Sequence, residues 1–309
     1  MTVALLFPGQ GAQQAHMLEG LPDSTTARQV LDEARAIIGT LGITGDVDDP
    51  GRDTVASQLA LVTAGVACGR ALTEDGGVNV GFVAGHSVGA FPAAALAGVI
   101  SLRDALITVH QRAVSMKAVC GDRDWGMAAI LGLRTATASA IAHEAATVDH
   151  PVWVANVNSA TQTVLAGSVA GLTALEERAR VAGARSFERL DVDIASHGQL
   201  QEPTAEIVAR CLDAVTVQPP TVKYISNIGG RTISSAAAVC YDLAYSVTRP
   251  VRWYDGVRLM AELGVTCTVE VLPGHTLSRL VDATVPAITT LALGEEGFTN
   301  CAARARRHT

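Results

Sequence analysis

Residues 78–99 read VNVGFVAGHSVGAFPAAALAGV and hold the strongest clue to the fold. The apolar run Val78–Ala84 predicts a buried β-strand, because a short apolar run bounded by glycine is typical of strands covered on both faces. Gly85 ends that run, and the segment 88–99 that follows predicts a helix. Pro92 fits the first turn of this helix, where its missing N–H is not needed. A buried strand that leads directly into a helix favours a parallel α/β sheet.

The same alternation extends in both directions from this segment. Val3–Phe7 predicts another buried strand, which ends in the glycine-rich turn after Pro8. Ser101 is the predicted N-cap of a long helix, since Asp104 follows it three residues later. The remaining predicted elements are helices at 26–38, 56–72, 102–119, 199–212, 251–263 and 276–281, and strands at 222–225 and 266–271.

The pattern changes between residues 125 and 193. The elements predicted there are strands at 127–133, 152–157, 163–166 and 186–192, and helices at 135–147 and 169–181. Their order, β-α-β-β-α-β, is typical of the ferredoxin-like arrangement. We therefore expect an α/β-hydrolase-like parallel-sheet domain built from residues 1–124 and 194–309, interrupted by a ferredoxin-like (βαββαβ) subdomain at 125–193.

Composition narrows the classes of partner. The 309 residues carry a formal net charge of −7, so a broad basic face for nucleic acid is not expected. The one basic cluster, Arg304, Arg306 and Arg307, is predicted to be a solvated terminus, with a contact to an acidic partner or a phosphate as the alternative. The N-terminus resembles no signal peptide and no stretch is predicted to reach transmembrane length, which predicts a cytoplasmic protein without a membrane partner.

The six cysteines are scattered along the chain. They form no C-x-x-C pair and no metal-ligand spacing with histidine or aspartate. The sequence therefore predicts reduced and mostly buried thiols, and no metal site.

Residues 85–89 match the pattern G-x-S-x-G at a predicted strand–helix junction, which is the context that this motif requires. A serine at such a turn exposes its hydroxyl, and the free N–H groups of the first helical turn can hold an oxyanion. Ser87 is therefore a candidate nucleophile. On the residues alone, the alternative is a glycine-rich turn whose serine has no chemical role.

A serine nucleophile needs a base, because an unassisted hydroxyl is scarcely ionised at neutral pH. Among the eight histidines, His197 and His275 are the closest candidates. His197 lies where the predicted insertion returns to the main domain, which is a natural edge for a cleft. Position favours His197 and leaves His275 open.

Gln10 and Arg112 are further candidates. Gln10 follows the first predicted strand, and loops at the carboxyl ends of parallel strands line active clefts, so Gln10 could contribute to an oxyanion site. Arg112 lies at the edge of the apolar stripe of its helix, and a planar guanidinium suits a substrate carboxylate. The alternatives are a plain turn and a solvated arginine.

Taken together, these motifs resemble the malonyl-CoA:acyl carrier protein transacylase family over nearly the whole chain. The resemblance rests on the segments FPGQG (7–11), GHSVG (85–89), SH (196–197), PVRW (250–253) and EVLPG (270–274), on Arg112 and on the insertion. It implies a Ser-His dyad of Ser87 and His197, an oxyanion site of Gln10 and the Val88 N–H, a malonyl carboxylate clamp at Arg112, and asparagines near the cleft at Asn156 and Asn158. It also implies no bound cofactor or metal, malonyl-CoA as the donor substrate and an acyl carrier protein as the partner.

Two positions depart from most of the family. Ala90-Phe91 follows the motif where members from fatty-acid synthesis usually carry an acidic residue and an aromatic, and GHSVGAF is similar to the epsilon subunit of malonate decarboxylase. The resemblance favours that branch, with the decarboxylase carrier subunit as the partner. Ser246 replaces a glutamine of the substrate pocket whose backbone carbonyl orients the histidine in the family. The alternatives are a transacylase of fatty-acid or polyketide synthesis, a serine thioesterase or hydrolase, and a non-catalytic assembly subunit.

Overall fold

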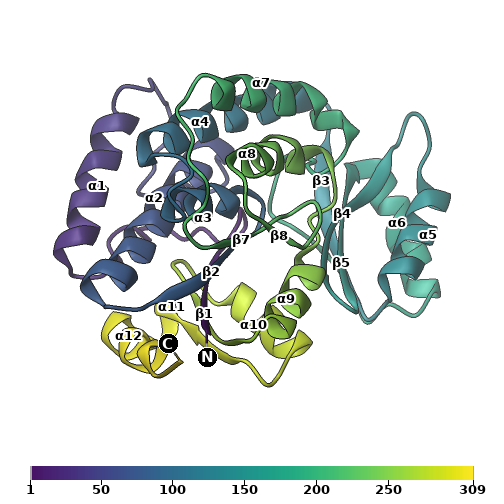
Figure 1. Ribbon diagram of the computed structural model, residues 1–309. Helices are drawn as coiled ribbons and strands as arrows, with labels where there is room; N and C mark the ends of the chain where they lie inside the picture. The colour runs from purple at the N-terminus through teal and green to yellow at the C-terminus, as the bar shows by residue number, and fades with distance from the viewer. Residues whose placement is uncertain (1, 309) are drawn as a thin grey trace.

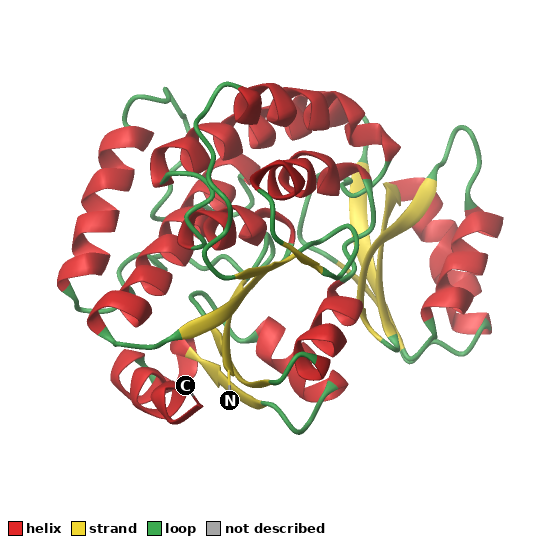
Figure 2. Ribbon diagram, in the orientation of Figure 1, coloured by secondary structure: helices red, strands yellow, loops and turns green. Residues whose placement is uncertain are grey.

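The computed structural model describes residues 2–308. Its strands form a larger sheet surrounded by helices and a smaller sheet beside it (Figure 2), and the larger sheet has six strands. Their order is β10-β9-β1-β2-β7-β8. All neighbours in this sheet run parallel except β7 and β8. The strands are β1 (Thr2–Phe7), β2 (Val80–Gly85), β7 (Lys223–Ile225), β8 (Thr232–Ile233), β9 (Val265–Glu270) and β10 (Thr289–Ala292).

The central strand β1 explains why the sheet is covered on both faces. Val3, Leu5 and Phe7 point into one apolar cluster, and Ala4 and Leu6 point into the other. This alternation of an entirely apolar strand requires helices on both sides (Figure 1). The first cluster includes residues of α1 (Thr25–Ile38), α2 (Thr54–Arg70), α3 (Ala90–Leu96), α4 (Leu102–Cys120), α7 (Glu202–Asp213), α8 (Ala236–Tyr245), α11 (Leu293–Glu296) and α12 (Phe298–Ala305). The second includes residues of α9 (Trp253–Glu262) and α10 (Thr276–Thr284).

A second, antiparallel sheet has the strand order β4-β5-β3-β6. Its elements are β3 (Trp125–Leu131), α5 (Thr135–Ala145), β4 (Val152–Ser159), β5 (Gln162–Ser168), α6 (Val169–Val181) and β6 (Ser186–Arg189). This chain order and strand order are those of the ferredoxin-like arrangement, so the predicted fold class is confirmed. The limits 125–193 for the insertion stay a prediction.

The two sheets are joined near the insertion. Backbone hydrogen bonds link β4 to the segment before α9: Val157 N–H donates to the Val251 carbonyl (2.8 Å) and Val251 N–H donates to the Ala155 carbonyl (2.9 Å). One face of the small sheet packs on α5 and α6. The other face shares a cluster with Ala205 and Val247 of the larger part. The small sheet is therefore fixed beside the carboxyl ends of the parallel strands.

Several predicted elements are confirmed with small shifts. The helix predicted at 102–119 is α4, and Ser101 caps it by accepting the Asp104 N–H. The helix predicted at 88–99 is shorter, because it consists of a 3-10 turn, Ser87–Gly89, followed by α3. No prediction covered β8, α8, β10, α11 or α12.

One prediction about the basic C-terminal cluster is confirmed in part, and one about membrane-length stretches was wrong. Arg306 and Arg307 are exposed, as a solvated cluster requires, but the segment that carries them is packed: Cys301, Ala302 and Ala305 are buried and Arg304 pairs with Glu296. The stretch Thr54–Asp75 is long and apolar enough to cross a membrane, with a mean hydropathy of 1.4 over its most apolar 18 residues, although no such stretch was predicted. In the structure 94% of its most apolar window is buried inside the protein.

The cysteines agree with the prediction. All six are free thiols, of which four are buried and two are partly buried.

Candidate active site

Ser87 occupies a strained turn between β2 and the helical segment that follows it. Its φ of 53° lies in the left-handed region, which costs a non-glycine residue about 1–3 kcal/mol. Glycines on both sides make the turn possible. A Cβ at Gly85 would lie 2.0 Å from the Gly89 carbonyl oxygen, and one at Gly89 would lie 2.1 Å from the Phe7 carbonyl oxygen. The turn therefore packs directly against the end of β1.

His197 faces this serine. Its Nε2 lies 2.9 Å from Ser87 Oγ, and its Nδ1 lies 2.8 Å from the Ser246 carbonyl oxygen. A carbonyl only accepts, so Nδ1 carries the proton and Nε2 is left to accept the serine hydroxyl. His197 also has a positive φ, 61°. A Cβ at the following Gly198 would lie 2.2 Å from Trp153 Nε1, so only glycine fits there.

Burial keeps His197 neutral. The side chain is 2% exposed, and burial lowers the pKa of His197 to about 3, with further lowering by the charges of Arg112 and His86. The hydrogen bond to Ser246 opposes this shift without reversing it. The imidazole is consequently a free base at neutral pH.

Arg112 reaches the same hydroxyl from α4. The residue is 1% exposed; Nη2 donates to Ser87 Oγ (3.2 Å) and Nη1 donates to Gln58 Oε1 (2.7 Å). Burial lowers the pKa of Arg112 to about 10, so the guanidinium stays charged at pH 7. Its Nε has no hydrogen-bond partner within residues 2–308. No carboxylate of the described residues forms an ion pair with this buried cation, which makes the site a natural anion position.

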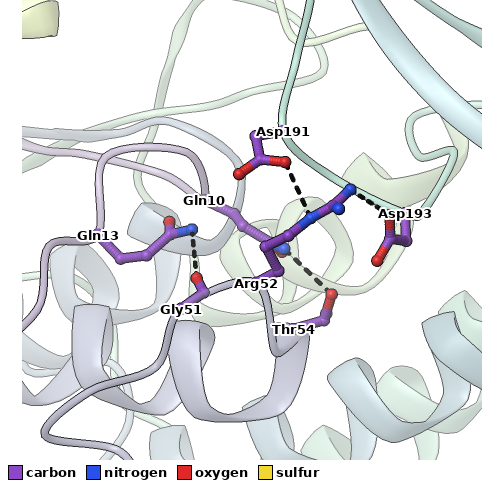
Figure 3. Close-up of polar contacts among 7 residues, drawn as sticks. All are labelled: Gln10, Gln13, Gly51, Arg52, Thr54, Asp191 and Asp193. Atoms are coloured by element: carbon purple, nitrogen blue, oxygen red, sulfur yellow. Dashed lines mark hydrogen bonds and ion pairs between the residues drawn. The ribbon is translucent and has the colours of Figure 1, made fainter.

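Gln10 is linked to Arg112 through Gln58. Gln58 Nε2 donates to Gln10 Oε1 (3.0 Å). Gln10 Nε2 in turn donates to Thr54 Oγ1 (3.1 Å), a contact drawn in Figure 3. The side-chain amide of Gln10 is thus held by α2. Its backbone and that of Val88 lie in the two turns that pack against each other beside Ser87.

The two asparagines differ in their environment. Asn156 is 6% exposed, and its Oδ1 has no hydrogen-bond partner among the described residues. Asn158 Oδ1 instead lies 3.1 Å from His86 Nε2 and holds that ring. A buried acceptor without a donor is costly, so Asn156 is the better placed of the two to receive a ligand N–H or O–H.

These side chains surround a cavity of about 370 Å³. Its lining includes Gln10, Gln58, Ser87, Arg112, Asn156 and His197. Arg52 lies in the same lining and pairs with Asp191 (2.9 Å) and Asp193, which follow β6 (Figure 3). One wall of the cavity therefore comes from the parallel sheet and the other from the insertion and its exit.

The structure brings most of the predicted site residues together. Val88, Asn158 and Ser246 lie next to the cavity rather than in its lining, and Ser246 contacts His197 instead of a substrate pocket. His275, the alternative candidate for the base, pairs with Glu295 (2.7 Å) and not with Ser87. Within residues 2–308 no group of three or more His, Cys, Asp or Glu side chains is placed to hold a metal ion.

Sequence reasoning missed Gln58 and Asn227. Gln58 connects Gln10 to Arg112, and Asn227 Oδ1 accepts the backbone N–H of Ser87 (2.9 Å). Neither residue belongs to a motif of residue types that carry chemistry. Their contacts join segments far apart in the chain, so no local spacing pointed to them.

Comparison with known proteins identifies the family to which this chain is similar. The family model of the acyl transferase domain matches residues 4–294. The malonyl CoA-acyl carrier protein transacylase of Salmonella typhimurium is 33% identical over 299 residues, covering 94% of this chain and 96% of that relative.

Solved structures are similar over the whole length. The acyl-carrier-protein S-malonyltransferase from Burkholderia pseudomallei superposes with a TM-score of 0.89 at 34% identity and covers 98% of this chain and 100% of its own. A malonyl-transacylase in complex with a type II PKS acyl-carrier protein gives a TM-score of 0.89 at 29% identity, covering 98% of this chain and 99% of its own. With a family model spanning nearly all of its length and a serine, histidine and arginine meeting in one cavity, the chain belongs to the acyl transferase domain family.

Proposed function

We propose that this chain moves a malonyl group from malonyl-CoA to the thiol of an acyl carrier protein through an acyl-serine intermediate. One observation carries the proposal: Ser87 Oγ lies within hydrogen-bond distance of both a neutral histidine and a buried arginine. The neutral histidine can act as the base in acyl transfer to or from any donor. The buried arginine can bind an acyl group that ends in a carboxylate.

In the first half-reaction, Ser87 Oγ attacks the thioester carbonyl while its proton passes to His197 Nε2. The oxyanion that forms is held by backbone N–H groups, for which Val88 and Gln10 are our candidates. The C–S bond then breaks, and the leaving CoA sulfur takes the proton from His197. The products are malonyl-Ser87 and free CoA.

The second half-reaction runs the same steps with a new thiol. The carrier thiol gives its proton to His197 Nε2 and attacks the acyl-serine carbonyl. The C–O bond to Ser87 breaks, and Ser87 Oγ recovers the proton. The transfer needs no metal or bound cofactor, because both half-reactions only move an acyl group and a proton.

Two cavity residues have proposed roles in substrate selection. Arg112 binds the malonyl carboxylate through its positive charge, which no carboxylate within residues 2–308 pairs with. Asn156 Oδ1, buried and without a donor, accepts an amide N–H of the pantetheine arm. Asn158 and Ser246 act indirectly, since they hold His86 and His197.

A narrower assignment concerns the acceptor. Residues 85–91, GHSVGAF, favour the epsilon subunit of malonate decarboxylase, in which the acceptor is the prosthetic-group thiol of that enzyme's carrier subunit. The named relatives are transacylases, which supports carrier-protein transfer in general. Purified decarboxylase carrier and fatty-acid carrier, offered in competition to the malonylated protein, separate the two assignments. A preference for the fatty-acid carrier refutes the narrower one.

Intact-protein mass spectrometry after mixing with malonyl-CoA tests the proposal. We expect a malonyl adduct on Ser87 that Ser87→Ala abolishes and that holo carrier protein removes. His197→Ala should slow both half-reactions by about 10²–10⁴-fold, the usual contribution of a general base. His275→Ala is the matched control and should leave both rates unchanged.

Three results would contradict this proposal. Failure to trap an adduct in the wild type would favour a non-catalytic subunit. Release of the adduct as free malonate at the same rate with and without carrier would favour a hydrolase. An effect of His275→Ala without one of His197→Ala would assign the base to the other histidine.

A further inference from the structure

The Asn227 side chain spans the turn that carries Ser87. Its Oδ1 accepts the Ser87 N–H (2.9 Å), and its Nδ2 donates to the Gly85 carbonyl (3.0 Å). Asn227 lies 140 residues after Ser87, in the segment that follows β7. The turn is therefore bound on both sides of His86 by a single amide from another part of the chain.

The Asn227 amide provides a hydrogen-bond partner for a backbone N–H of the turn that regular secondary structure leaves without one. Ser87 has a left-handed backbone, so its N–H continues neither the β2 ladder nor the helical hydrogen bonds that begin after it. The hydrogen bond to the Ser87 N–H restricts the backbone dihedral angles of Ser87. The direction of the Cα–Cβ bond follows, and with it the place of Oγ between His197 and Arg112.

Asp242 in turn fixes Asn227. It is 2% exposed, and its carboxyl oxygens accept the Asn227 N–H (3.0 Å), the Ile228 N–H (3.0 Å) and the Tyr224 hydroxyl (3.3 Å). Burial raises the pKa of Tyr224 well above its usual value, so the phenol remains a donor. A buried acceptor with three donors ties α8 to the loop after β7.

We propose that Asn227 and Asp242 are positioning residues of the nucleophile: Asp242 holds the backbone of Asn227, and the Asn227 amide holds the turn that aims Ser87. Both lie outside the lining of the 370 Å³ cavity, so they act through Ser87 and not on the substrate. The inference rests on the proposed role of Ser87.

The test measures the rate of acyl-serine formation at saturating malonyl-CoA by rapid quench and mass spectrometry. We expect Asn227→Ala and Asp242→Asn to slow this step by about 10- to 100-fold, the range that misplacing a reacting atom by about 1 Å can cost. The affinity for CoA, measured by calorimetry, should stay unchanged. A purely structural role would instead lower the fraction of active protein and leave the rate of each active molecule as in the wild type.

Glu270 offers a matched control. Like Asp242 it is a buried carboxylate, but it lies at the end of β9 and accepts two backbone N–H groups of α10, those of Leu277 (3.1 Å) and Ser278 (2.7 Å), and none of the turn that carries Ser87. Glu270→Gln should lower thermal stability without slowing acylation. The proposal is overturned if Asn227→Ala acylates at the wild-type rate, or if Glu270→Gln slows acylation as much as Asp242→Asn.

Two provisions keep the test decisive. If Asn227→Ala does not fold, Asp242→Asn against Glu270→Gln decides the matter by the same criterion. If the wild type forms no malonyl adduct, the proposed function fails, and labelling of Ser87 by a fluorophosphonate then tests the positioning separately. That reagent needs only a nucleophilic serine, so equal labelling rates in wild type and Asn227→Ala overturn the inference by themselves.

Discussion

Arg112 is a buried positive charge, and its Nη2 donates to Ser87 Oγ. We expect Arg112→Ala to lower kcat/KM for malonyl-CoA by at least tenfold, because truncating one partner of a buried charge pair costs about 2–5 kcal/mol. Acetyl-CoA lacks the carboxylate and should lose much less. The measurement is the ratio of the two kcat/KM values, which removes any general effect on Ser87.

Arg112→Lys is the control variant that keeps the positive charge but lacks the planar, two-pronged guanidinium. It should restore part of the malonyl preference, since lysine keeps the charge and loses the two-pronged donor. Equal losses for malonyl-CoA and acetyl-CoA in Arg112→Ala would make the arginine a structural residue.

The pH dependence of acylation follows from the environment of His197. Because burial lowers the pKa of His197 to about 3, its base form persists as the pH falls from 8 to 5. We therefore expect a nearly flat rate of malonyl-Ser87 formation across this range, measured on protein shown to be folded by circular dichroism. An exposed histidine with a pKa of about 6.5 would keep only about 3% of its base form at pH 5. A tenfold fall in rate by pH 5 would contradict the buried, neutral imidazole.

The sequence predicted individual site residues unequally well. Ser87 was predictable because its motif is local, and because the residues on either side of the motif show the patterns of a strand and a helix. His197 was favoured over His275 by position alone, since the choice depends on which of them reaches Ser87 across the fold. Asn227 had no signal, because its amide meets the turn only after segments 140 residues apart come together.

At the scale of elements, the turn between β2 and α3 depends on its contact with the end of β1. A Cβ at Gly89 would lie 2.1 Å from the Phe7 carbonyl oxygen and 2.7 Å from that of Pro8, and a backbone cannot move aside as a side chain can. We expect Gly89→Ala to destabilise the fold by about 3 kcal/mol, the upper end for overpacking, and to abolish acylation. Thermal unfolding and adduct formation measure the two effects.

Gly126→Ala is the comparison for Gly89→Ala. Its added methyl would meet Leu172 at 3.7 Å, an ordinary contact, so stability and acylation should change little. Gly89→Ala protein with wild-type stability would show that the turn and β1 are free to separate.

Elements were predictable where the sequence pattern was long or bounded by clear signals. The helix α4 has an N-cap, an acidic first turn and an apolar stripe, and its predicted limits agree with the structure to within one residue. The strands β8 and β10 have two and four residues, too few for a period to show. They are strands because β7 and β9 offer them backbone partners, which is a property of the assembled sheet.

At the scale of the whole molecule, Arg52 links the two walls of the cavity through Asp191 and Asp193. Without it, two unpaired carboxylates would face the phosphates of an approaching CoA thioester. We expect Arg52→Ala to lower kcat/KM for malonyl-CoA about two- to tenfold at low ionic strength, and the loss to disappear near 0.5 M salt, where screening shortens the reach of exposed charges. Stability should change by less than about 1 kcal/mol, since the pairs are exposed.

Arg180→Ala removes a comparable exposed pair, that with Glu177 on α6, away from the cavity. It should leave kcat/KM unchanged at every salt concentration. An equal effect of the two substitutions, or a loss from Arg52→Ala that salt does not relieve, would rule out local repulsion at the cavity.

The division of the cavity between two walls has a consequence for hybrid enzymes. Ser87 and Arg112 belong to the parallel-sheet part, whereas Asn156 lies in the insertion and His197 just beyond its exit. A recombinant that imports a foreign segment ending before residue 194 retains its own base and acquires a new wall. One whose crossover falls after residue 198 inherits wall and base together, along with the glycine that packs against Trp153. Every imported segment that carries a foreign Trp153 and ends before residue 198 sets that indole against a resident Ser196 or Gly198, so such libraries should be poorer in active members than libraries with the crossover after residue 198.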